Sequence, residues 1–484
     1  MLILLYVLDA LRPDHLGCFG YPRNTSTHID QLAQDGVVFE KCFSSSTWTR
    51  PVAASLLTGA YPAIHGARTR YDWFSTGLLR LPEVLQEKGY KTAAFSTMGN
   101  IGSDIGFDRG FDQYFDLYRD LAILAKRQRL DPTEAGLLHA SEGESVALPR
   151  AEDVNDALFP WLEKNGEQNA FCFLWSIETH VPYTAPEQFR KFSGPAPLPP
   201  KAGTQEDIRQ AGAADRDRLI DLYDNEIYYN DACIGEMIAK LKSLGVYNDT
   251  MLIIMSDHGD AFFEHGVYAH GHTPFEELIH VPLIIKFPHS QYAGRRVEHL
   301  VELIDLFPTI ARVADAPIPP ENSCVQGCDL ISLLDTDSSE RKYVFSDTQM
   351  VDVHNRYYSV RDQHWKYIKI ESAERNRGTF LDTLKYILKR RLLLKILKSP
   401  RHYLRNYMGQ SNKFLFDLQS DPTESVNLIS EKSDIANQMQ QILADWRKRN
   451  EALAGKVAAL PKDIVGYEES EILTRHLKKL GYLE

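Results

Sequence analysis

Side chains that could bind a metal ion follow two apolar runs of the sequence. Asp9 ends the first run, and Asp257 and His258 come directly after the second, at residues 250–256. Carboxylate and imidazole groups at the end of a strand are suitable ligands for a divalent metal ion. Taken alone, Asp9 is explained as simply by a turn or cap. The downstream segment 264–274 adds three imidazoles, those of His265, His270 and His272.

A hydroxyl group at the start of a helix is the other chemical feature. Thr49 stands two residues before Pro51, and an apolar helical stretch follows. Proline is favoured in the first turn of a helix and threonine near the cap, so a structural cap is one interpretation. A nucleophile is the other, because free N–H groups at a helix N-terminus attract an anionic group. This segment alone leaves both interpretations open.

The elements that must position these groups follow an alternating pattern of strands and helices. Several expected strands are continuously apolar, which is typical of a mainly parallel sheet that is covered on both faces. We therefore predict an α/β fold, an α/β/α sandwich. The expected strands are 2–8, 36–43, 91–96, 170–177, 250–256 and 281–287, and the expected helices include 81–88, 152–164, 215–243 and 300–314.

The pattern changes after about residue 330. Short alternating segments at 342–347, 356–361, 364–370 and 413–418 predict an antiparallel sheet, which a polar helix at 431–453 would cover. We predict a catalytic α/β domain at 1–330 and a smaller α+β domain at 331–484.

A basic amphipathic insertion is expected inside the second domain, at about 378–412. No acidic residue occurs from Thr383 to Phe416, whereas lysines, arginines and leucines alternate there. The segment is either a surface helix that covers the sheet or a peripheral contact with a membrane through 383–407. The net charge of the whole chain is −12, which argues against a general nucleic-acid-binding protein.

The N-terminus indicates a buried strand rather than a signal peptide. No apolar run reaches the ~18 residues that span a bilayer, and the first run leads straight into Asp9. We expect a cytoplasmic protein, with peripheral membrane contact as the open alternative. The six cysteines are scattered, and we expect free thiols rather than a zinc site at Cys324 and Cys328.

Ordered motifs along nearly the whole chain resemble the sulfatase branch of the alkaline phosphatase superfamily. The matching stretches are Asp9 to Gly17, Ser55 to Gly59 with Tyr61-Pro62 and His65-Gly66, Gly106 to Phe111, Glu178 to Pro182, Ser256 to Gly259, Glu276 to Pro282, and Leu415 to Leu428.

The resemblance implies a role for each matching residue. Asp9, Asp257 and His258 would bind a divalent metal ion, and Thr49 would be the nucleophile beside it. His180 and His270 would contact the transferred anion, protonate the leaving group or bind a second metal. For a second ion, the third ligand would come from His65, His265, His272 or Asp14. We also assign substrate binding to Arg50, Asn100 and His272.

Departures from the family pattern point away from sulfate chemistry. Sulfatases carry a cysteine or serine that becomes formylglycine, within Cys/Ser-x-Pro-x-Arg, whereas this chain has Thr49 there and Ala53 in place of the arginine. Ala10 replaces an aspartate and His258 an asparagine, so an imidazole replaces oxygen ligands. This change favours Zn²⁺ or Mn²⁺ over Ca²⁺, with one or two ions. The lysine-bearing segment of the family is replaced by residues 96–102.

We therefore predict a metal-dependent hydrolase or transferase that acts on phosphate esters, either diesters or monoesters, through Thr49. The substrate would be a small-molecule, glycan-linked or lipid-linked anionic ester. A sulfatase that works without formylglycine and a non-catalytic family member remain as alternatives. An intramolecular phosphomutase is disfavoured because the sequence has no inserted cap domain between the motifs.

Overall fold

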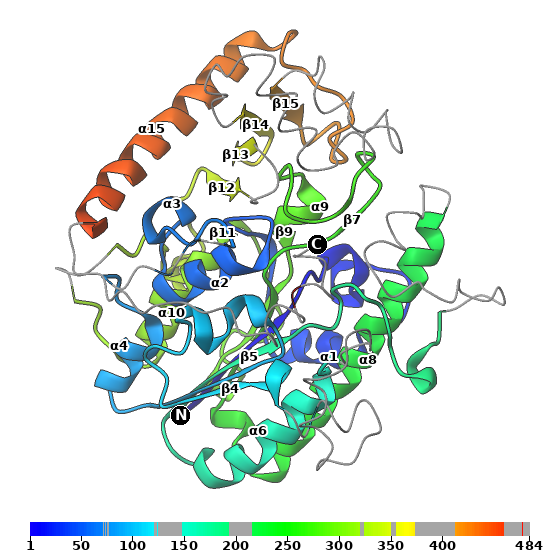
Figure 1. Cartoon of the computed structure of the whole chain (residues 1–484), viewed down its shortest axis with the longest axis vertical. Helices are drawn as coiled ribbons and strands as arrows, with labels where there is room; N and C mark the ends of the chain where they lie inside the picture. The colour runs from blue at the N-terminus through cyan, green and yellow to red at the C-terminus, as the bar shows by residue number, and fades with distance from the viewer. Residues whose placement is uncertain are drawn as a thin grey trace, which may run out of the picture.

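Two sheets organise the chain. The computed structural model describes residues 1–70, 72, 74, 77–120, 123, 148–192, 215–319, 324–349, 355–372, 412–458 and 477. Within these residues, a sheet of nine strands forms the larger part and a sheet of four strands forms the C-terminal part (Figure 1). The predicted α/β fold with a smaller C-terminal α+β domain is confirmed, and the boundary at 330/331 stays a prediction.

The centre of the large sheet is β1 (Leu2–Leu8). It pairs in parallel with β5 (Ala170–Ser176) and with β6 (Met251–Ser256), and every one of its side chains is buried. This burial on both faces explains its continuous apolar composition. The strand order is β11-β2-β10-β6-β1-β5-β3-β4. The remaining strands are β2 (Val37–Phe43), β3 (Lys91–Ser96), β4 (Gln113–Asp116), β9 (His280–Val281), β10 (Leu283–Lys286) and β11 (Arg295–Glu302).

Helices cover both faces of this sheet (Figure 1). Ile3, Leu5 and Val7 of β1 pack into a core with the helices of one face, and the alternate residues pack with those of the other face. The first face has α2 (Thr49–Thr58), α4 (Leu81–Glu87), α10 (Leu306–Val313) and α11 (Leu330–Thr336). The second has α1 (Thr27–Asp35), α6 (Ala151–Asn165) and α8 (Arg216–Ser243).

The C-terminal sheet is an antiparallel meander with one long helix against it. Tyr358, Tyr367 and Leu415 of the sheet share a core with Met439 and Trp446 of the helix. The strands are β12 (Val344–Gln349), β13 (Asn355–Arg361), β14 (Trp365–Ser372) and β15 (Lys413–Asp417), and the helix is α15 (Ser433–Ala458). Figure 1 shows α15 along the outer side of this sheet.

One expected helix is partly wrong. The range 300–314 contains the end of strand β11, a short 3-10 turn at Leu303–Asp305, and then α10. The apolar residues Leu300 and Val301 continue the pattern of the helix, but they are buried in an edge strand that pairs with β2. Periodicity could not separate the two elements because apolar residues continue across the junction. The short, half-exposed β4 was not predicted.

Other expectations concern segments and groups outside the two cores. The basic insertion at about 378–412 lies outside the described residues, so a membrane contact there stays a prediction. All six cysteines are free thiols, as expected. No helix within the described ranges is long and apolar enough to cross a membrane. The cellular compartment stays a prediction.

Candidate active site

Parallel pairing of β1 with β6 brings the metal-binding candidates together. Leu8 is in register with Ser256, so the next residues, Asp9 and Asp257, leave the sheet at the same edge. The ligand atoms of Asp9, Asp257 and His258 lie within 4.8 Å of one another, and all three residues are fully buried. Among the residues that the structure describes, this is the one group of three such donors.

The free electron pairs in this group fit a cation. Asp9 Oδ2 accepts a hydrogen bond from the indole of Trp175 (3.0 Å), and Asp257 Oδ1 accepts one from the amide of Ala10 (3.1 Å). The other oxygens, Asp9 Oδ1 and Asp257 Oδ2, are buried with no hydrogen-bond partner in the described part of the chain. Burial, and then the charge of Asp257, raise the pKa of Asp9 well above its usual range. A divalent cation would offset this cost.

The orientation of His258 completes the ligand set. Its Nδ1–H donates to the carbonyl of Gly259 (2.9 Å), which directs Nε2 into the site. In a neutral imidazole Nε2 carries a lone pair, and it lies 3.2 Å from Asp257 Oδ2 and 3.7 Å from Asp9 Oδ1. At these distances the lone pairs of the three ligand atoms repel one another, and a cation bound between them would remove that repulsion.

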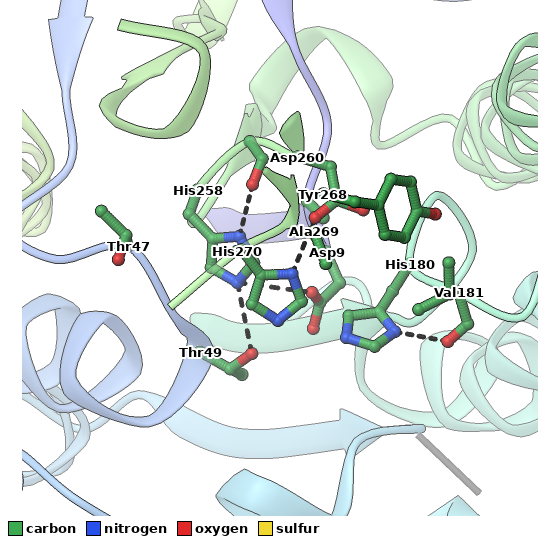
Figure 2. A network of polar contacts seen from close by, with 12 residues as sticks. Asp9, Thr47, Thr49, His180, Val181, His258, Asp260, Tyr268, Ala269 and His270 are labelled. Atoms are coloured by element: carbon green, nitrogen blue, oxygen red, sulfur yellow. Dashed lines mark hydrogen bonds and ion pairs between the residues drawn. The ribbon is translucent and has the colours of Figure 1, made fainter. Parts of the chain in front are cut away.

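Thr49 lies beside this group. It is the first residue of α2, after the cap position at Trp48, and its Oγ1 is 3.4 Å from His258 Nε2. Figure 2 shows the hydroxyl of Thr49 directed at the imidazole of His258, with Asp9 close by. The structure therefore brings together all four residues that the sequence assigned to the metal and the nucleophile.

Two further imidazoles extend the site. The ring of His270 lies 4.3 Å from that of His258, and the ring of His180 lies 4.8 Å from that of His270 (Figure 2). His180 Nδ1–H donates to the carbonyl of Val181 (2.5 Å), and His270 Nδ1 is 2.8 Å from Asp260 Oδ1. Burial, and then the neighbouring His270, lower the pKa of His180 to about 3. Burial, and then the charge of His258, lower the pKa of His270 well below its usual value. These shifts favour the neutral form of both rings.

Strained backbone accompanies these side chains. Ala10, Thr179 and Ala269 have φ angles of 63°, 77° and 65°, and each is adjacent to one of the site residues Asp9, His180 and His270. The Thr179 hydroxyl donates to the carbonyl of Asp9, which ties the His180 loop to the end of β1. A branched residue such as threonine rarely adopts this conformation, and such strain is typical of functional sites.

The three residues assigned to substrate binding have different surroundings. Arg50 Nε donates to the carbonyl of Asn100 (3.1 Å), and Nη2 is 3.5 Å from Asn100 Oδ1. Asn100 Nδ2 is buried with no hydrogen-bond partner among the described residues. His272 Nε2 donates to the carbonyl of Ala269 (2.9 Å), and its Nδ1 is likewise unsatisfied. Arg50 and Asn100 are thus brought together, and substrate binding by all three stays a prediction.

Three of the four residues expected as third ligand of a second metal ion have partners of their own, and the fourth, His272, keeps an Nδ1 that is unsatisfied among the described residues. His65 Nε2 is 3.1 Å from the hydroxyl of Ser55, and His265 Nδ1 is 2.7 Å from Glu277. Asp14 forms a two-point ion pair with Arg12. The choice between one ion and two therefore stays a prediction.

Sequence reasoning missed two residues that orient the others. Asp260 holds the ring of His270, and Trp175 holds the carboxylate of Asp9. The position of Asp260, two residues after His258, was a usable signal. No such signal exists for Trp175, because a tryptophan within an apolar strand is usually an ordinary core residue.

Comparison with known proteins decides the family. The model of the family described as "Sulfatase" matches residues 2–316. The chain belongs to the sulfatase family. A second model, "N-sulphoglucosamine sulphohydrolase, C-terminal", matches residues 263–383 of this sulfatase-family chain. This chain is accordingly an ester hydrolase, and Asp9, Asp257 and His258 form a possible site for the divalent metal ion that members of the family bind.

Individual relatives span most of the chain. Human iduronate 2-sulfatase is 24% identical over 508 residues, which cover 89% of this chain and 91% of the relative. The N-acetylgalactosamine-6-O-sulfatase of Bacteroides thetaiotaomicron is 23% identical over 532 residues, with 92% and 93% covered.

Two solved structures show the same fold. The phosphonate monoester hydrolase of Agrobacterium radiobacter has a TM-score of 0.68 at 20% identity, covering 93% of this chain and 95% of that one. A 2-O GAG sulfatase has a TM-score of 0.66 at 18% identity, covering 96% and 94%.

Proposed function

We propose that this sulfatase-family protein hydrolyses or transfers phosphate esters, with the hydroxyl of Thr49 as its nucleophile. The observation that carries the proposal is the position of Thr49, whose Oγ1 is 3.4 Å from His258 Nε2. Threonine cannot be converted to formylglycine, so the hydroxyl itself must attack. Phosphoryl transfer to a threonine hydroxyl is feasible where a neighbouring cation and a base activate it.

The metal site supports this chemistry. Asp9, Asp257, His258 and Thr49 would hold a divalent ion, which would lower the pKa of a bound hydroxyl and neutralise phosphoryl oxygens. The imidazole among the donors favours Zn²⁺ or Mn²⁺ over Ca²⁺, which prefers oxygen ligands.

Side chains of the protein carry out bond formation, proton transfer and binding of the anion. Thr49 Oγ forms a bond to phosphorus in line with the ester oxygen, and the bond from phosphorus to that oxygen breaks. One imidazole, that of His180 or that of His270, takes up the proton that Thr49 loses and gives it to the leaving alkoxide. Water or an acceptor alcohol then resolves the phosphothreonine. Arg50 and Asn100 supply donors for the transferred anion.

The relatives support one chemical class of substrate. Their names specify sulfate groups on sugars, which supports a glycan-linked anionic ester as the substrate of this chain. A lipid-linked ester stays a prediction that depends on residues outside the described part.

The test compares four p-nitrophenyl esters: a sulfate, a phosphate monoester, a phosphodiester and a phenylphosphonate. Each is assayed with Zn²⁺, Mn²⁺ and Ca²⁺, for the wild type and for Thr49→Ala. We expect turnover of a phosphate ester with Zn²⁺ or Mn²⁺, and a loss of at least about 10³-fold in the variant, because the nucleophile is gone.

Sulfate hydrolysis is the second candidate function, which the names of the relatives favour. Sulfate turnover that survives in Thr49→Ala would establish it and would remove Thr49 as the nucleophile. Tight metal binding without turnover of any ester would instead indicate a non-catalytic family member.

A further inference from the structure

The edge strand of the C-terminal sheet contacts the segment that leads to the nucleophile. In β12, the amide of Asp347 donates to the carbonyl of Ser45 (2.9 Å). The hydroxyl of Thr348 accepts a hydrogen bond from the amide of Thr47 (3.0 Å) and lies 3.1 Å from Ser46 Oγ. A strand some 300 residues later in the sequence therefore holds the chain just before Thr49.

Thr47 in turn binds the histidine loop, which is the segment 264–274 that carries His265, His270 and His272. Its carbonyl accepts the amide of Gly271 (2.8 Å), and its hydroxyl donates to the carbonyl of His272 (3.0 Å). Thr47 is two residues before Thr49, and Gly271 follows His270 directly. One residue thus connects the C-terminal sheet, the nucleophile segment and the histidine loop.

The residues of this connection are buried, so water cannot replace the hydrogen bonds between them. Ser46, Thr47 and Thr348 each have 0% of their surface exposed, so solvent does not reach the amide of Thr47. If the hydroxyl of Thr348 were lost, that amide would be left buried without a partner, and the segment would shift to satisfy it.

We propose that Thr348 is a positioning residue, which acts through Thr47 to set the distance between Thr49 and His270. This inference rests on the proposed function in so far as Thr49 and His270 are the reacting groups. The metal ligands Asp9, Asp257 and His258 follow β1 and β6, so a loss at Thr348 leaves their arrangement intact.

The experiment replaces Thr348 with valine, which keeps the shape and removes the hydroxyl, and with serine, which restores the hydroxyl. Thr309→Val is the matched control. The Thr309 hydroxyl is equally buried, accepts the amide of Leu330 (2.9 Å) and donates to the carbonyl of Asp305 (2.6 Å), away from the site. Thr348→Val and Thr309→Val therefore each lose a buried hydrogen bond from a backbone amide to a threonine hydroxyl, the first near the site and the second away from it.

We expect Thr348→Val to lower kcat by about 10- to 100-fold with little change in KM, because a small misplacement of reacting groups acts on the chemical step. Thr348→Ser should recover most of the activity. Thr309→Val should lower the melting temperature to a similar extent and leave kcat within about twofold of the wild type. Equal kcat values for the two valine variants, or no rescue by serine, would overturn the proposal.

Hydrogen exchange gives a readout that needs no substrate. In Thr348→Val, the amide of Gly271 should exchange at least about tenfold faster than in the wild type and in Thr309→Val. Unchanged exchange at Gly271 would refute the connection through Thr47. If the wild type turned over no ester, the proposed function would fail, and the exchange rates would still decide this inference.

Discussion

Single residues set the chemical character of the site. In the proposed ligand set, His258 would supply a nitrogen beside the oxygens of Asp9, Asp257 and Thr49. Its ring is fixed by the carbonyl of Gly259, so Nε2 alone faces the site. We therefore propose that the identity of this one side chain decides which metal ion the site prefers.

At this scale, we predict that His258→Asn shifts the metal preference toward Ca²⁺. The affinity for Zn²⁺ should fall by about 100-fold or more, because an amide oxygen replaces the imidazole, and Ca²⁺ should lose much less. Isothermal titration calorimetry with both ions measures this. His265→Asn is the control, since that imidazole is bonded to Glu277. An equal loss for both ions in His258→Asn would contradict the prediction.

Two buried carboxyl groups, those of Glu178 and Glu226, connect loops near the site to helices α6 and α8. Glu178, just after β5, accepts the amide of Ala151 at the start of α6 (2.9 Å). Glu226 of α8 accepts the amide of Ala185 (2.6 Å). Burial, and then the charge of Glu226, raise the pKa of Glu178 to about 8, and burial raises the pKa of Glu226 to about 7. Burial therefore favours the neutral form of both groups, although the hydrogen bonds from the backbone amides favour the charged form.

This pair predicts a stability that falls with rising pH. A carboxyl group whose pKa is higher in the folded than in the unfolded chain contributes fully below the unfolded value, and its contribution is lost as the pH rises through the folded value. The loss should extend from about pH 4.5 to about pH 8. Glu226→Gln should reduce the difference in unfolding free energy between pH 5.5 and pH 8.5 by about 1–3 kcal/mol.

Urea denaturation at the two pH values measures that difference. Glu163→Gln, at an exposed position of α6, should leave it unchanged. If Glu226→Gln showed the same pH dependence as the wild type, the buried pair would not be its origin.

At the scale of the whole molecule, a network of ion pairs connects the C-terminal sheet to the segment that begins at Glu276. Lys366 of β14 lies 3.0 Å from Glu276 and 2.9 Å from Glu424, and it is fully buried. Arg361 of β13 also pairs with Glu276 (2.9 Å). Because Glu276 begins α9 (Glu276–Ile279), at the end of the histidine loop, the C-terminal sheet holds that loop on a second side.

At this scale, we predict that Lys366→Met destabilises the protein by about 3–5 kcal/mol. The substitution keeps a side chain of similar length but leaves the buried Glu424 and the partly exposed Glu276 with less compensating charge. Thermal and urea denaturation measure the loss. Lys88→Met, at an exposed ion pair, should have little effect. Adding Glu424→Gln to Lys366→Met should recover part of the stability, and a purely additive double variant would argue against the network.

The sequence by itself determined the fold class and the residues at the centre of the site. Asp9 and Asp257 end continuously apolar strands, and such strands pair in parallel and end at one edge of the sheet. Thr49 was placed by the proline that follows it at the start of α2. The fold class and the start of a helix at Thr49 are confirmed, because each depends on local chain chemistry and on one general rule of sheet topology, and the roles of these residues stay predictions.

Only the tertiary structure decided how the groups are held. The bond from Thr47 to Thr348, the contact of Asp260 with His270 and the indole of Trp175 against Asp9 depend on side-chain direction and on the packing of the two sheets. Threonine and tryptophan at these positions have ordinary structural explanations in the sequence. A hydrogen bond between distant segments leaves no periodic signal, because it is set by where the packed elements bring two atoms and not by the composition of either segment.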